Sequence, residues 1–148
     1  MRNLLSLLAK LLLFWITLFI LQQACFVFFD TSRLNDVSQE ALLLGFRRAL
    51  PMNLATACYL LLPVALCGIV LLFREIHWLR SAMKGITAIL VVLTCIINVC
   101  DIALFMAWGT KVNHKALSYL AFPEEVMHAA AGAPVAQLVV VFMAQCAL

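Results

Sequence analysis

The chain has 148 residues, of which 66% are hydrophobic and 11% charged, whereas a soluble domain usually carries about 25% charged residues. This composition, with a mean hydropathy of +1.10, excludes an ordinary water-soluble fold and indicates a protein of the lipid bilayer. The net charge of +3 is small and no segment clusters four or more basic residues, so no nucleic-acid partner is expected.

The apolar residues fall into four long runs, and the first covers residues 11–29. About 20 apolar residues in a helix cross the ~30 Å hydrocarbon core of a bilayer, so each run is expected to be a membrane span. A secretory signal peptide is the alternative for the first run, because Arg2 and Lys10 precede it. The run is longer than a typical signal-peptide core, and no small-x-small cleavage site follows Phe29, which favours an uncleaved span.

A polar connection leads into a predicted interfacial helix over residues 36–48. Asp36 stands three residues before Gln39, the spacing of a capping box that opens a helix. Arg47 and Arg48 close the segment after a stretch with an apolar side, a pattern typical of a helix that lies on a membrane surface. The sequence therefore predicts an amphipathic helix at the bilayer interface before the second span.

The second predicted span, residues 52–73, contains no charge and has Pro63 near its middle. A proline inside a helix removes one backbone hydrogen bond, so we expect a kink there. The short segment 74–85 is basic and is similar to a cytoplasmic loop. Its charged residues are Arg74, Glu75, Arg80 and Lys84.

The third predicted span, residues 86–108, is the only one that contains a formal charge, on Asp101. A carboxylate inside a span costs roughly 2.5 to 3.5 kcal/mol on translocon scales, so it is expected to face a partner or a wet cavity. Asn98 lies one turn earlier on the same face and shares either role. Two interpretations stay open: a structural site, with Arg47 or Arg48 as the basic partner or with snorkelling to the interface, and a lipid-headgroup, substrate-path or ion-relay site.

The last predicted elements are an interfacial helix over residues 113–128 and a fourth span over residues 129–148. The helix contains Glu124, Glu125 and His128, an E-x-x-H spacing that occurs in carboxylate-bridged metal sites. Such sites need a second motif of this kind and further carboxylates, so no metal site is predicted. The fourth run has no basic or aromatic anchor after it, and we expect the chain to be a fragment of a longer protein.

No motif of catalysis is found along the chain. All of the cysteines lie in apolar runs and none forms a C-x-x-C pair, so we interpret them as small packing residues. The sequence also lacks a Gly-rich phosphate loop, a G-x-S-x-G elbow and a Ser-x-x-Lys pair. No catalytic residue and no cofactor are therefore predicted for this segment.

The predicted fold class is all-α, a polytopic transmembrane helical bundle with four spans. With the N-terminus inside the cell, the inner and outer segments carry equal numbers of basic residues, but those of segment 74–85 crowd one short loop. Because Lys and Arg in short loops favour the cytoplasmic side, we expect the N-terminus inside.

A family resemblance rests mainly on four stretches: Asp101–Gly109, Asn113, Leu117–Leu120 and Phe122–Glu125. They contain an aspartate near the end of a predicted span, an aromatic residue and a glycine after it, and a Tyr-Leu and a Pro-Glu in the predicted outer loop that follows. This pattern resembles the membrane domain of the lipoteichoic acid synthase family, the membrane-anchored phosphoglycerol transferases of the alkaline phosphatase and sulfatase superfamily. The resemblance extends over residues 29–127.

The resemblance implies five spans in a bacterial inner membrane, then an extracytoplasmic domain that moves a phosphoglycerol group from a lipid with a threonine nucleophile and a divalent metal such as manganese. This sequence contains neither the fifth span nor that domain, so the segment is expected to be a non-catalytic membrane anchor. Its expected partners are the lipid bilayer and a phospholipid headgroup. Two alternatives stay open: the membrane domain of a phosphoethanolamine transferase, or a complete small four-helix membrane protein such as a transporter subunit or scaffold.

Overall fold

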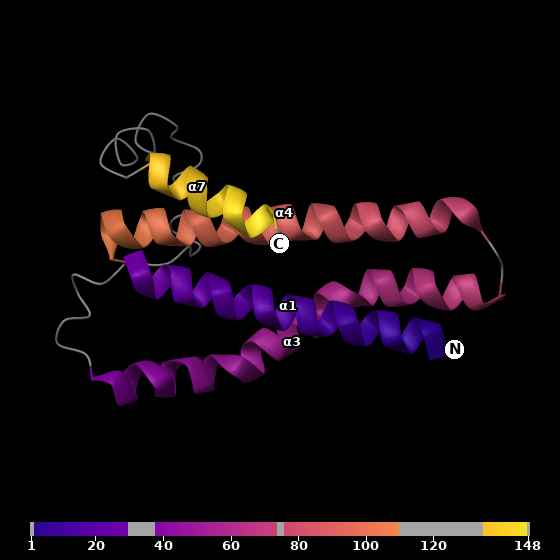
Figure 1. Cartoon of the computed structure of the whole chain (residues 1–148), viewed down its shortest axis with the longest axis horizontal. Helices are drawn as coiled ribbons and strands as arrows, with labels where there is room; N and C mark the ends of the chain where they lie inside the picture. Colours follow the sequence, from indigo (N-terminus) through magenta and orange to yellow (C-terminus); the bar gives the residue numbers. More distant parts are fainter. Residues whose placement is uncertain (1, 30–37, 74–75, 110–134, 148) are drawn as a thin grey trace.

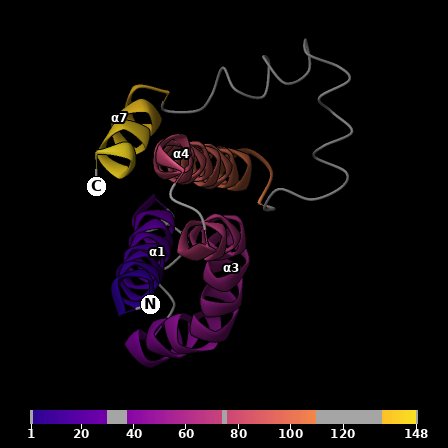
Figure 2. The ribbon, with the colours of Figure 1, turned by 90° about the vertical axis from the view of Figure 1, so that its right-hand side faces the viewer.

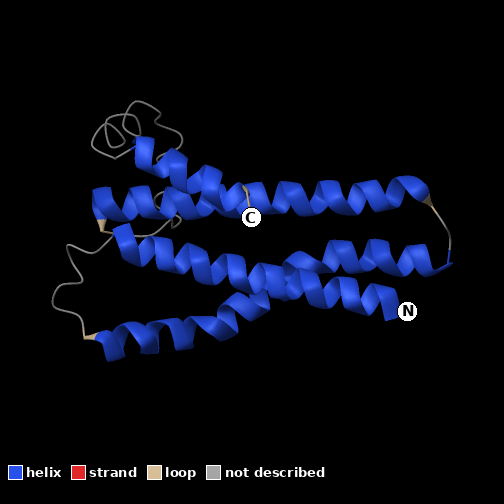
Figure 3. Cartoon of the chain, viewed as in Figure 1, coloured by secondary structure: helices blue, strands red, loops and turns tan. Residues whose placement is uncertain are grey.

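The computed structural model describes residues 2–29, 38–73, 76–109 and 135–147. The elements of these residues are all helices (Figure 3): α1 (Arg2–Phe29), α3 (Gln39–Phe73), α4 (His77–Trp108) and α7 (Val135–Cys146). Successive long helices run in opposite directions (Figure 1). The start of α1, the end of α3 and the start of α4 lie at one end of the bundle, the N-terminal end, and we call the other end distal. The predicted all-α helical bundle is confirmed.

In the part of the chain that the structure describes, three helices, α1, α3 and α4, are long and apolar enough to cross a membrane. They contain 28, 35 and 32 residues, more than the ~20 that a bilayer core requires. Their outward faces carry large exposed apolar side chains, among them Leu13, Leu66 and Ile89. Such faces are unfavourable in water and suit hydrocarbon, so the chain is a membrane protein.

Helix α3 joins two elements that the sequence predicts as separate. The interfacial segment 36–48 and the span 52–73 fall largely within one helix that continues through Pro51 and Pro63. Each proline lacks the N–H that would bond one turn back, and α3 is accordingly bent rather than straight (Figure 1). The hydroxyl of Ser38 accepts a hydrogen bond from the Ala41 amide at 3.3 Å, so Ser38 caps the described helix.

Helix α4 begins earlier than predicted, because residues 77–85 of the basic segment are helical. Arg80 and Lys84 therefore lie on α4 and not in a loop. At its other end Gly109 has a φ of 69°, a left-handed conformation that an L side chain disfavours. The Gly109 amide donates to the Phe105 carbonyl at 2.9 Å and terminates the helix.

Helix α7 has 12 residues, a length of about 18 Å that is less than the ~30 Å hydrocarbon core. The predicted fourth span, residues 129–148, is thus represented by a short apolar helix. Residues 129–134 and 148 lie outside the described part of the chain, as does the predicted interfacial helix 113–128.

The core lies where α1 crosses α3. Trp15 and Leu18 of α1 are almost fully buried, and they pack with Ala57 and Leu61 of α3. The Trp15 ring stacks on Phe19 with ring centroids 5.9 Å apart. Seen along the bundle axis, α4 lies between α7 and the pair formed by α1 and α3 (Figure 2). Helix α4 therefore contacts each of the other helices and positions the polar residues described next.

Candidate functional site

A line of uncharged polar side chains crosses the apolar interior from α1 through α4 to α7. It consists of Gln22, Cys95, Asn98 and Gln145, and we call it the polar seam. The Gln22 Nε2 donates to the Cys95 sulfur at 3.9 Å, and the Asn98 Nδ2 donates to the backbone carbonyl of Gln22 at 3.4 Å. The Gln145 Nε2 donates to the Asn98 Oδ1 at 3.0 Å. Asn98 thus bonds to both neighbouring helices.

The bonds of the seam fix the orientation of each amide in it. Because the Asn98 Nδ2 is directed at a carbonyl, its Oδ1 faces α7, and Gln145 must present its nitrogen there. The Gln145 Oε1 is then left buried without a hydrogen-bond partner among the described residues. Gln145 itself is 3% exposed. A buried carbonyl without a donor is unfavourable, so this atom is the weak point of the seam.

The chemistry of the seam is that of a structural contact. A nucleophilic cysteine is partly accessible and stands beside a base or a cation, whereas Cys95 is fully buried and accepts a bond from a carboxamide. Amides hold helices together in hydrocarbon without titrating. In the described ranges, no group of three or more His, Cys, Asp or Glu side chains is placed to hold a metal ion.

The structure places the four residues that the sequence selects on two different helices. Asn98 lies in the seam and Asp101 is half-buried one turn further along α4, as their spacing predicts. Arg47 and Arg48 are exposed on the first half of α3. That half diverges from α4, with α1 between them (Figures 1 and 2). The described residues therefore do not bring the two arginines together with Asn98.

Sequence reasoning missed Gln22, Cys95 and Gln145 as members of one site. The available signal was that Gln22 and Gln145 are amides inside apolar runs, where an unpaired polar group is unfavourable. Their common partner lies 76 residues from Gln22 and 47 residues from Gln145. Only the packing of α1 and α7 on α4 reveals the connection. The predicted E-x-x-H residues Glu124, Glu125 and His128 lie outside the described residues.

The distal end of α4 also holds a contact between rings. Phe26 of α1 and Phe105 of α4 meet edge to face, with ring centroids 4.9 Å apart. This contact and the seam fasten α1 to α4 over the distal half of the bundle, where Asp101 lies. Asp101 is therefore presented from a helix that is held on both sides by packing and hydrogen bonds.

No family model, no curated protein and no solved structure matches this chain. Its function is therefore inferred from the residues and their arrangement.

Proposed function

We propose that this chain is a non-catalytic membrane-anchoring domain. The observation that carries the proposal is the polar seam, which joins α1, α4 and α7 through neutral amides inside an apolar bundle. Interhelical hydrogen bonds of this kind select one arrangement of helices in lipid, where the hydrophobic effect does not. A domain with fixed helices holds whatever is attached to it at a set distance from the bilayer.

The resemblance supports a narrower form of the proposal, in which the anchor belongs to a lipoteichoic acid synthase-like transferase of a bacterial inner membrane. Of the four stretches on which the resemblance mainly rests, Asp101–Gly109 forms the distal end of α4 and its glycine cap. The other matching stretches lie outside the described residues. In this form the catalytic domain, with its divalent metal such as manganese, sits beyond the distal end. The N-terminus then lies in the cytoplasm.

Two measurements test the proposal. Membranes that contain the expressed chain are washed with alkaline carbonate, and the chain should stay in the pellet; its release would contradict an integral anchor. The purified chain is then incubated with phosphatidylglycerol or phosphatidylethanolamine and manganese. We expect no released phosphoglycerol or phosphoethanolamine, and turnover would show that the domain is catalytic.

The narrower form has its own test in the organism that makes the protein. An antibody raised against the exposed start of α3 should detect a product much larger than the 16.4 kDa of this chain. Membranes depleted of that product should lose phosphoglycerol transfer. A product of the same mass as this chain would instead support the small four-helix membrane protein.

A further inference from the structure

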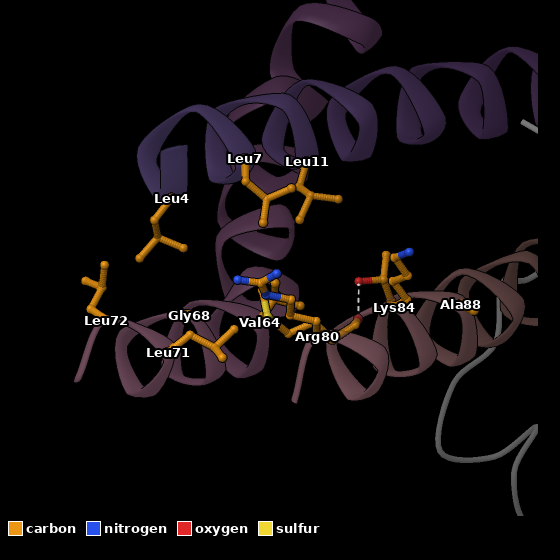
Figure 4. A pocket seen from close by; sticks show the side chains of 12 residues that line it. Leu4, Leu7, Leu11, Val64, Gly68, Leu71, Leu72, Arg80, Lys84 and Ala88 are labelled. Atoms are coloured by element: carbon orange, nitrogen blue, oxygen red, sulfur yellow. Dashed lines mark hydrogen bonds between the residues drawn. The ribbon is translucent and has the colours of Figure 1, made fainter. Parts of the chain in front are cut away.

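A second feature of the bundle lies at its N-terminal end, away from the polar seam. There the three long helices leave an apolar groove with a volume of about 700 Å³, within the range of ligand sites. Leucines of α1 face α4 across it, and α3 supplies its remaining wall (Figure 4). Among the lining residues are Leu4, Leu7, Leu11, Gly68, Arg80 and Lys84.

Gly68 of α3 meets Leu4 of α1 at one side of the groove. A Cβ atom built on Gly68 would collide with the Cδ end of the Leu4 side chain, so the glycine leaves room for this leucine in its present position. Leu4 and Gly68 both line the groove, and residues of α4 line it from the other side (Figure 4). The resulting walls are aliphatic, and they suit a hydrocarbon chain.

The polar side chains of the groove all come from α4. Arg80 and Lys84 lie one helical turn apart and therefore share a face. The third, Thr87, already donates its hydroxyl proton to the Met83 carbonyl at 2.9 Å. Two cations are thus the groups that the groove offers to a ligand.

From the pattern of the sequence, we expect the two cations at the depth of lipid headgroups. The apolar run of α4 begins at Ile86, so the turns that carry Arg80 and Lys84 extend beyond the hydrocarbon core. Trp78, 69% exposed on the same turns, is typical of the membrane interface. Arg74 and Glu75, between α3 and α4, lie outside the described residues and have opposite charges.

We propose that this groove binds one anionic phospholipid, with an acyl chain along the leucines of α1 and the phosphate at Arg80 and Lys84. Basic sites between membrane helices bind lipid headgroups in this way. A free anion would gain nothing from the aliphatic walls. A second copy of the chain would place the same two cations against each other across a symmetric interface, which is unfavourable.

The proposal is tested by titrating palmitoyl-oleoyl phosphatidylglycerol and the matching phosphatidylcholine into the protein in neutral detergent. Native mass spectrometry counts bound lipids and also reports any dimer. Basic side chains near a membrane surface attract anionic lipids, and two of them predict about thirtyfold tighter binding of phosphatidylglycerol, which corresponds to about 2 kcal/mol. Inorganic phosphate alone should not bind.

Three variants locate the effect. Arg80→Gln with Lys84→Gln should abolish the preference for phosphatidylglycerol. Arg47→Gln with Arg48→Gln removes the same charge from exposed positions at the distal end and should leave the preference intact. Ala88→Phe fills the groove, keeps both cations and should weaken both lipids severalfold. Circular dichroism confirms that each variant is helical before it is titrated.

Several outcomes would overturn the proposal. Equal binding of the two lipids would mean that the cations do not select a headgroup. An equal loss of the preference for phosphatidylglycerol in the two double variants, at Arg80 and Lys84 and at Arg47 and Arg48, would show that the lipid responds to the overall charge of the protein and not to a site. Unchanged binding in Ala88→Phe, or a dimer in place of bound lipid, would show that no acyl chain occupies the groove.

Discussion

Replacing Asn98 with leucine should destabilise the bundle more than the same change at Gln145, although both remove one shared hydrogen bond. Asn98 accepts from Gln145 at 3.0 Å and donates to the Gln22 carbonyl at 3.4 Å. Its loss leaves the Gln145 nitrogen without that partner in addition to the buried Oε1. Loss of Gln145, in contrast, removes its own unsatisfied carbonyl and leaves without its donor only the Asn98 Oδ1, on a side chain that is half-buried and not fully buried.

The magnitudes follow from two known terms. An interhelical hydrogen bond in a membrane protein contributes about 0.6 kcal/mol and at most about 1.7. A buried polar group left without a partner costs about 1 to 3 kcal/mol. Asn98→Leu should therefore lower the free energy of unfolding by about 2 kcal/mol, and Gln145→Leu should change it by less than about 1. The double variant should lose about 1 kcal/mol less than the sum of the two single variants, because no Gln145 amide is then left without its partner.

The assay is equilibrium unfolding in mixed micelles of a neutral detergent and dodecyl sulfate, followed by circular dichroism. Asn53→Leu is the control, because the Asn53 Nδ2 is buried without a partner among the described residues and belongs to no part of the seam. This change should be neutral or slightly stabilising. Strict additivity of Asn98→Leu and Gln145→Leu would refute the reasoning.

Three further predictions address packing, helix termination and topology. Trp15→Ala should lower the free energy of unfolding by about 2 kcal/mol, less than in a water-soluble core, because the side chain is surrounded by lipid and not by water when the helices separate. Exposed Trp78→Ala should change it by less than about 0.5 kcal/mol. Equal losses in the two variants would contradict the placement of Trp15 in the core. Gly109→Ala should cost about 1 kcal/mol, measured in the same unfolding assay, because the φ of 69° disfavours an L side chain; an unchanged midpoint would contradict that cap. Alkaline phosphatase fused near Lys115 should be active in bacterial cells and inactive near His77, and the reverse pattern would invert the topology.

The sequence was sufficient for the class of fold because that information is local. The long apolar runs over residues 11–29, 52–73 and 86–108, with Asp101 as their single formal charge, require lipid whatever their neighbours are. The residues at which the helices begin and end were harder to predict. Arg80 and Lys84 resembled loop residues by charge, yet both are good helix formers and the chain between His77 and Ile86 contains no proline.

The candidate site was accessible only in part. Asn98 could be selected because it lies one turn before Asp101 on the same face of the predicted span. Its partners could not be named, because pairing Asn98 with Gln22 and Gln145 depends on how α1 and α7 pack. The groove at Arg80 was hidden for the same reason, since the leucines that form its wall are more than 60 residues away in α1. A sequence shows which side chains need a partner, and the packing decides which partner they have.

The two ends of the bundle differ in charge, and this difference links topology to the lipid site. At the N-terminal end the charged side chains that the structure describes are Lys10, Arg80 and Lys84, whereas at the distal end the acids Glu40 and Asp101 accompany Arg47 and Arg48. Basic residues near short connections are retained in the cytoplasm, and anionic lipids give that leaflet its negative surface potential. If the N-terminus lies inside, as proposed, the bundle meets this leaflet with the end that carries the groove. The basic side chains proposed to orient the domain would then also hold its lipid, so the phosphatase fusions and the lipid titration test the same arrangement independently.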